Sequence, residues 1–179
     1  MRLADISRSK QRKGCLGLSR VTGANRWYRP RLESLEFRCL LSISPSTIVG
    51  RYVFYDDSKF DGGMAGVNAG DSAAIATDKS ALLPNATSSF ANVTSYAAGI
   101  DGIMVDISGA HGSITASDFI FRVGNNNAPA SWAAAPTPSA VSVLSGGGAG
   151  GSDRMEVVWP AGSITKKWLE VIVDANTDT

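Results

Sequence analysis

The chain has 179 residues, and its 17 Lys and Arg against 16 Asp and Glu give a formal net charge of +1. It has one histidine, which excludes a metal site built from several histidines. Its two cysteines, Cys15 and Cys39, both precede residue 44, so residues 44–179 can form no internal disulfide, thiolate metal site or cysteine nucleophile.

The near-neutral total hides two regions of opposite charge. Residues 1–43 hold ten basic and three acidic residues, a net charge of +7, so residues 44–179 carry a net charge of −6. This asymmetry indicates a basic tail with a role of its own. The tail lacks the apolar stretch of about 7–15 residues that a secretory signal needs, and no apolar run approaches the roughly 20 residues of a membrane span. We expect residues 1–43 to be largely disordered or to form a short helix, and we expect no transmembrane span.

The end of this basic segment reads Arg-Leu-Glu-Ser-Leu-Glu-Phe-Arg-Cys-Leu-Leu-Ser over residues 31–42. It resembles the LEPR-XLL sorting motif at the amino termini of large secreted or surface proteins of planctomycete bacteria. The matching residues are Leu35, Glu36, Arg38, Leu40 and Leu41. Phe37 stands where the family usually has proline. The resemblance implies export or cell-surface sorting, and therefore an extracellular or cell-surface location.

Two other interpretations of this segment follow from its residues alone. The spacing of its leucines is close to that of a short amphipathic helix. Its positive charge is also typical of an arm that binds nucleic acid. The acidic body lacks the basic surface that a nucleic-acid-binding protein normally carries, so we expect no nucleic-acid partner.

The body contains seven short runs of β-branched and aromatic residues, separated by Gly, Asn, Asp and Ser. Such runs predict β-strands, and such separators predict turns. In chain order the predicted strands are residues 48–55, 90–96, 103–107, 119–123, 140–144, 155–159 and 168–173. Because side chains alternate along a strand, Ile103, Val105 and Ile107 are predicted on one face. We expect an all-β fold over residues 44–179, an antiparallel β-sandwich or jelly roll.

Three pieces of the body, residues 71–79, 99–107 and 118–125, resemble parts of one recurring module. This module is found near the carboxyl ends of the same planctomycete surface proteins, often beside a dockerin-like calcium-binding segment. The sequence contains no match to the calcium loop Asp-x-Asn/Asp-x-Asp-Gly. The resemblance therefore implies a β fold and a surface context, and it implies no activity.

The aspartates of the body suggest calcium as a cofactor. Five of them precede residue 79: Asp56, Asp57, Asp61, Asp71 and Asp78. Asp57 and Asp61 flank a turn that ends in two glycines, and calcium takes carboxylate oxygens as ligands. We therefore predict Asp57 and Asp61 as calcium ligands, with simple capping of turns as the alternative. Asp101 and Asp106 are weaker candidates.

Aromatic residues suggest a sugar-binding surface, because flat aromatic faces suit pyranose rings. Trp132 lies among Ala and Pro in a predicted loop, and with Tyr96 it is the candidate for glycan binding. Packing beneath the loop is the alternative for Trp132. Trp159 and Trp168 fall in predicted strands, where packing in the core is the commoner outcome.

No catalytic arrangement is predicted. His111 lies in a predicted loop and is expected to be an exposed bystander rather than a catalytic base. Glu156 and Glu170 lie in predicted strands and are expected to face solvent, not to form the carboxylate pair of a glycosidase. We predict a non-catalytic module of an exported bacterial surface protein that acts in adhesion or attachment. Its expected partner is an extracellular polysaccharide or another surface protein. The alternative is a carbohydrate-binding accessory domain of a secreted polysaccharide-degrading enzyme.

Overall fold

The computed structural model of the protein describes residues 46–174. The basic segment with its sorting motif lies outside the described residues. Within the described range, the strands are β1 (Thr47–Phe54), β2 (Gly102–Ser108), β3 (Phe119–Gly124), β4 (Ala133–Ala134), β5 (Ala140–Leu144), β6 (Asp153–Val158) and β7 (Trp168–Val173). The short 3-10 helices are η1 (Asp71–Ala74), η2 (Phe90–Asn92), η3 (Ala116–Asp118), η4 (Pro129–Ser131) and η5 (Ala149–Gly151). In this part of the chain, no helix is both long and apolar enough to cross a membrane.

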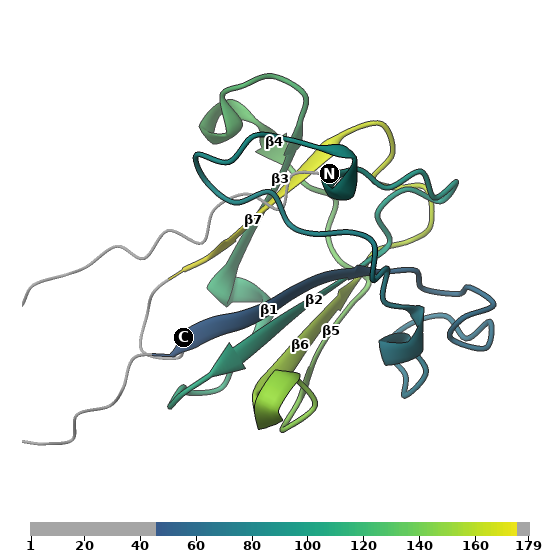
Figure 1. Cartoon of the computed structure of the whole chain (residues 1–179), viewed down its shortest axis with the longest axis vertical. Coiled ribbons are helices and arrows are strands. Elements are labelled where there is room, and N and C mark those ends of the chain that lie inside the picture. Colours follow the sequence, from purple (N-terminus) through teal and green to yellow (C-terminus); the bar gives the residue numbers. More distant parts are fainter. Residues whose placement is uncertain (1–45, 175–179) are drawn as a thin grey trace, which may run out of the picture.

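The strands form two antiparallel sheets, which lie one above the other in Figure 1. The four-stranded sheet has the order β1-β2-β6-β5, and the three-stranded sheet has the order β4-β3-β7. β2 pairs with β1 on one side and with β6 on the other, so Ile103 lies between Val53 and Val157. The prediction of an all-β fold is therefore confirmed.

Six of the seven predicted strands are confirmed, with ends that differ by at most two residues. The strand predicted over residues 90–96 is wrong, because Phe90–Asn92 forms a 3-10 turn. The Asn92 side chain accepts a hydrogen bond from the Ser89 NH at 2.8 Å and donates one to the Ser80 carbonyl at 3.0 Å. These side-chain bonds replace a strand ladder and outweigh the β propensity of Phe90, which is 92 % exposed.

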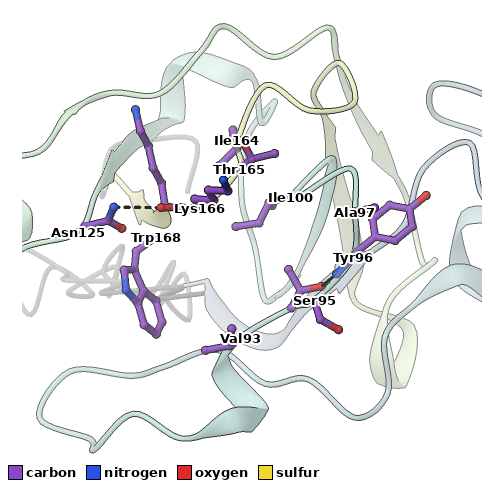
Figure 2. A pocket seen from close by; sticks show the side chains of 13 residues that line it. Val93, Ser95, Tyr96, Ala97, Ile100, Asn125, Ile164, Thr165, Lys166 and Trp168 are labelled. Carbon is purple, nitrogen blue, oxygen red and sulfur yellow. Dashed lines mark hydrogen bonds between the residues drawn. The ribbon is translucent and has the colours of Figure 1, made fainter.

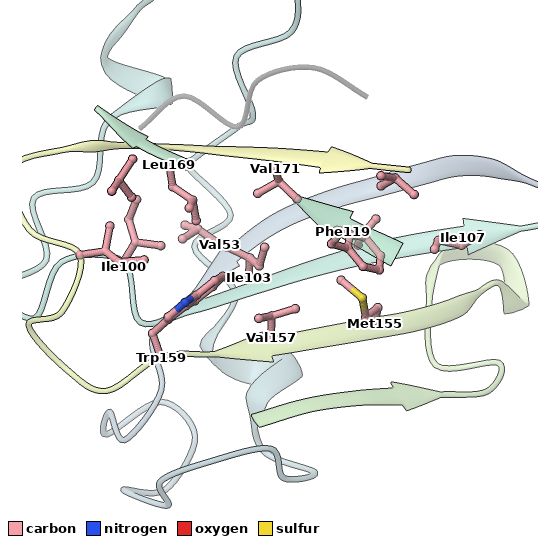
Figure 3. Close-up of a cluster of buried hydrophobic side chains, with 14 of the residues drawn as sticks. Val53, Ile100, Ile103, Ile107, Phe119, Met155, Val157, Trp159, Leu169 and Val171 are labelled. Atoms are coloured by element: carbon pink, nitrogen blue, oxygen red, sulfur yellow. The ribbon is translucent and has the colours of Figure 1, made fainter. Parts of the chain in front are cut away.

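One hydrophobic core lies between the two sheets (Figure 3). The four-stranded sheet contributes Ile103, Val105 and Ile107, as their alternation predicted. The three-stranded sheet contributes residues from β3 and β7, including Phe119, Val123, Leu169, Val171 and Val173. The Trp159 ring meets the Phe121 ring edge-on at 5.2 Å. Burying each large side chain stabilises the fold by about 1.5–3 kcal/mol, so this shared core holds the sheets together.

The opposite face of the four-stranded sheet is also covered. Phe54, Met104 and Val158 point to this face and pack with Ala74 of η1 and with Val67. Both covering residues belong to residues 55–75, which follow β1 and include η1. We call this segment the β1–η1 loop. The loop is fixed to the strand it leaves by hydrogen bonds from the Tyr55 NH to Ala74 and from the Ala76 NH to Val53. Its acidic residues are thereby held against the sheet.

Candidate metal centre

The β1–η1 loop brings three aspartates together beside the sheet. Each of Asp56, Asp61 and Asp71 offers one carboxylate oxygen, and these oxygens all lie within 4.8 Å of one another. The three residues are 8 %, 3 % and 0 % exposed, respectively. We call these three residues the acidic cluster.

Backbone NH groups of the loop orient the three carboxylates. Gly66 donates to Asp56 Oδ1 at 2.9 Å, and Gly63 donates to Asp61 Oδ1 at 2.9 Å. Asn68 donates to both oxygens of Asp71, through its backbone NH at 2.8 Å and its side-chain amide at 2.7 Å. The loop therefore folds around its own acidic groups rather than exposing them.

Gly70 allows this loop to close. A Cβ atom at Gly70 would lie 2.5 Å from the backbone oxygen of Asp61, a distance that real Cβ atoms do not reach. Gly62 and Gly63, which follow Asp61, both have positive φ angles, at 87° and 68°. Such angles are strained for residues with side chains. The glycines thus make the turn that carries Asp61 inward.

A fourth buried carboxylate, that of Asp101, lines the same hollow as Asp56 of the acidic cluster. Asp101 is 1 % exposed, and it directly precedes β2, whose first residue Gly102 pairs with Phe54 of β1. Burial, together with the charges of Asp56 and Asp61, raises the pKa of Asp101 to about 7. The NH groups of Asp56 and Asp101 partly oppose this shift. These two NH groups fall outside good hydrogen-bond geometry, so among the described residues neither oxygen of Asp101 has a well-formed hydrogen bond.

The other carboxylates of the centre are also poorly compensated. Burial raises the pKa of Asp56 and of Asp71, and neighbouring carboxylates raise both further. The Oδ2 atom of Asp61 is buried without a hydrogen-bond partner in the described part of the chain. Within residues 46–174, no lysine or arginine forms an ion pair with these four aspartates. Burying an unpaired charge costs several kcal/mol, so the centre lacks a positive charge.

Searches with this chain against protein families, curated proteins and solved structures find no match. The chemistry of the centre therefore follows from its own geometry. Hard cations such as calcium take six to eight oxygen ligands, with carboxylates and waters among them. A hollow of about 400 Å³ is lined by Asp56, Asp57 and Asp101, so it reaches two of the buried carboxylates of the centre.

The sequence located this centre only in part. Asp61, which was predicted as a ligand, belongs to the acidic cluster. Asp57 does not belong to it, since its side chain is exposed and its backbone has a φ angle of 51°. Asp78 lies 2.8 Å from the ammonium group of Lys79 in an ion pair. Asp101 is remote in sequence and reaches the cluster through the pairing of β1 with β2, which local spacing does not reveal.

The two residues predicted for glycan binding are both at least half-buried. Trp132 is 7 % exposed, and its indole NH donates to Asn126 Oδ1 at 2.8 Å. Its ring lies over Gly124, where a Cβ atom would come within 2.3 Å of it. Tyr96 is half-buried, and its ring contacts that of Tyr55 at 4.3 Å. Tyr96 lines one hollow and Trp132 lines another, and the two hollows share Asn125 and Trp168.

The prediction that Glu156 and Glu170 face solvent is wrong, because both are buried. Glu170 lies 3.3 Å from the guanidinium group of Arg122. Burial, with the charge of Asp71, raises the pKa of Glu156 to about 7. The β1–η1 loop covers this face of the sheet, and the sequence pattern of an isolated strand contains no sign of that cover. His111, which was predicted to be exposed, is half-buried, and its Nε2 atom lies 3.2 Å from Asp153 Oδ2.

A second buried polar network lies on the same face of the sheet. Arg154 Nε donates to Asp106 Oδ1 at 2.7 Å, and Arg154 Nη2 donates to Asp106 Oδ2 at 2.9 Å. The Ala149 NH adds a further bond to Asp106 Oδ2 at 2.9 Å. Burial alone would raise the pKa of Asp106, but these donors hold it below its ordinary value. Here the protein supplies its own cation, in contrast to the acidic cluster.

Proposed function

We propose that the chain is a non-catalytic β-sandwich module of an exported bacterial surface protein, which acts in adhesion or attachment and binds calcium. The proposed ligands are Asp56, Asp61, Asp71 and Asp101. The observation that carries the proposal is the set of buried carboxylate oxygens without partners, on Asp61 and Asp101, beside an acidic cluster with no lysine or arginine paired to it among the described residues. A bound cation supplies the missing charge and completes the coordination of these oxygens.

Calcium suits the centre better than magnesium. Magnesium demands near-ideal octahedral geometry and retains most of its waters, whereas calcium accepts irregular sets of many oxygens. The centre offers up to four carboxylates from three separated stretches of chain, on one loop and one strand end. Such an irregular, carboxylate-rich set favours calcium.

The proposed location and the proposed ion support each other. Calcium sites of extracellular modules bind at about 0.1–1 mM, a concentration met outside cells. The similarity of residues 31–42 to a sorting motif supports export, and the absence of cysteine from residues 44–179 leaves no thiol to be oxidised there. The two facing sheets around one core support the sandwich architecture. Such a stable platform with loops at its ends suits attachment to another surface.

Thermal unfolding of the full chain tests the proposal. We expect the melting temperature to rise by about 4–10 °C between excess EGTA and 10 mM calcium chloride. A ligand at 10 to 100 times its Kd contributes about 1.4–2.7 kcal/mol, and each kcal/mol raises the melting temperature of a domain this size by roughly 3–4 °C. Magnesium at 10 mM should give a clearly smaller rise.

Matched variants make the result specific. Asp71→Asn should remove most of the calcium-dependent rise, since Asp71 is fully buried in the cluster. Asp57→Asn should preserve it, because Asp57 is exposed and asparagine tolerates its positive φ angle. An equal melting temperature in EGTA and calcium, or equal responses of the two variants, would contradict the calcium site.

A further inference from the structure

Two hollows meet where β3 ends and β7 begins. Asn125 and Trp168 line both of them. The larger hollow, of about 500 Å³, lies between residues 93–100 and residues 164–168 (Figure 2). The smaller one, of about 280 Å³, lies between residues 82–88 and residues 125–127. We call the two together the Trp168 groove.

The groove has a flat aromatic wall with polar groups around it. Trp168 is half-buried, and it lines the larger hollow together with Val93, an exposed apolar residue (Figure 2). Asn125, Thr94 and Thr165 add amide and hydroxyl groups to the lining. An aromatic face beside donors and acceptors matches the two surfaces of a pyranose ring, one apolar and one rich in hydroxyls.

Positive charge is concentrated at the same place. The described residues include seven Lys and Arg against twelve Asp and Glu, so the body as a whole is acidic. Lys166 and Lys167 nevertheless both line the groove, and among the described residues neither forms an ion pair. The Asn125 side-chain amide donates to the Lys166 carbonyl at 3.0 Å and fixes this turn. The two lysines thus belong to a turn that lines the groove, and among the described residues neither ammonium group forms an ion pair with a protein anion.

We propose that the Trp168 groove binds an acidic polysaccharide, through a uronate unit whose ring stacks on Trp168. Its carboxylate pairs with Lys166 or Lys167. A neutral glycan would leave both lysines unused, whereas a carboxylate on each sugar supplies the charge they lack. No residue of the acidic cluster lines the groove, although Tyr96, which lines the larger hollow, lies within range of the charges of Asp101 and Asp57. The groove includes both residues predicted for glycan binding, since Tyr96 lines the larger hollow and Trp132 the smaller one, but the proposed stacking residue is Trp168.

Calorimetry with a matched pair of ligands tests this proposal. The full chain is titrated with tetragalacturonate and with its methyl ester, which keeps the sugar rings and removes the charge. We expect the acid to bind at least tenfold more tightly than the ester, and we expect its affinity to fall as sodium chloride is raised from 50 to 300 mM. Absence of binding by millimolar tetragalacturonate, or equal binding of acid and ester, would overturn the proposal.

Three variants distinguish this groove from nonspecific charge. The double variant Lys166→Gln, Lys167→Gln should lose at least tenfold in affinity for the acid, and Trp168→Leu should weaken both ligands. Lys59→Gln is the control, since Lys59 lies on another loop against Phe60. If the control and the double variant weaken binding equally, the groove is not the site. The calcium-dependent melting temperature, measured on each variant, shows that it is folded and tests the cation centre separately.

Discussion

Replacing Asp101 with asparagine should stabilise the protein when calcium is absent and weaken its response when calcium is present. The side chain keeps its shape in Asp101→Asn but loses its charge. In the structure this carboxylate is 1 % exposed, has no hydrogen-bond partner among the described residues, and has a pKa raised to about 7. The charge proposed to bind calcium is therefore the charge that destabilises the site without an ion.

The magnitude follows from the pKa. A rise from 3.8 to about 7 corresponds to about 4 kcal/mol against the ionised form above pH 8, at about 1.4 kcal/mol for each pH unit. Asparagine is also buried without partners, so the expected gain in the free energy of unfolding is smaller, about 2–3 kcal/mol.

The sign of the pH dependence is fixed by the same shift. The folded state of the wild type holds the Asp101 proton more tightly than the unfolded state, so its stability should fall as pH rises from about 4 to about 7. In Asp101→Asn this part of the fall should be missing, and the two proteins should converge near pH 4. Calcium should reverse the trend in the wild type, because it binds the ionised carboxylates.

Urea unfolding gives the free energy of unfolding of both proteins in four conditions, which are pH 5 and pH 8, each in EGTA and in 10 mM calcium. Asp57→Asn is the matched control and should change the free energy of unfolding by less than about 0.5 kcal/mol in each condition. The reasoning fails if Asp101→Asn is destabilised in EGTA at pH 8 while it retains the full calcium-dependent increment. Such a result would mean that Asp101 has a structural partner and is no ligand.

Three further predictions can be tested. Gly70→Ala should destabilise the protein by about 1–3 kcal/mol and lower its calcium affinity, because the new methyl group would lie 2.5 Å from a backbone oxygen of the β1–η1 loop. An unchanged midpoint of urea unfolding would contradict this close contact. Asp106→Asn should lower the free energy of unfolding by about 3–5 kcal/mol, because it leaves the Arg154 guanidinium buried without the carboxylate that lies 2.7 Å from it. Urea unfolding measures this loss, and a loss below about 1 kcal/mol would argue against a buried ion pair. Replacing Arg38 and Leu40 together with alanine should retain the protein inside its native cells, as fractionation and immunoblotting would detect; unchanged surface exposure would refute the sorting role.

The strands could be predicted because their alternating side chains reflect one buried face. Ile103, Val105 and Ile107 point into the core as their spacing required. The failure at Phe90 has a local cause, since side-chain bonds from Asn92 satisfy a turn and leave the aromatic ring exposed. Sequence patterns predict strands well from side-chain alternation. They predict strands less well where side chains form hydrogen bonds with the backbone in place of a neighbouring strand.

The candidate site was less predictable because its parts are joined by long-range pairing. Asp61 was recognisable from the two glycines after it, yet its neighbour Asp57 is exposed. Asp101 reaches the acidic cluster only because β2 pairs with β1, and Glu156 is buried only because a loop covers its strand. These facts belong to the tertiary structure, which no local motif encodes.

The acidic cluster lies on a loop that covers apolar strand residues, so its charge affects how firmly that loop is held. When the ion is missing, repulsion among the aspartates works to lift this cover from Phe54, Met104 and Val158. A site with the affinity of extracellular modules stays empty in the cytoplasm, where free calcium is scarce. If the proposed calcium site and the proposed export both hold, the loop would therefore close firmly over the sheet only outside the cell.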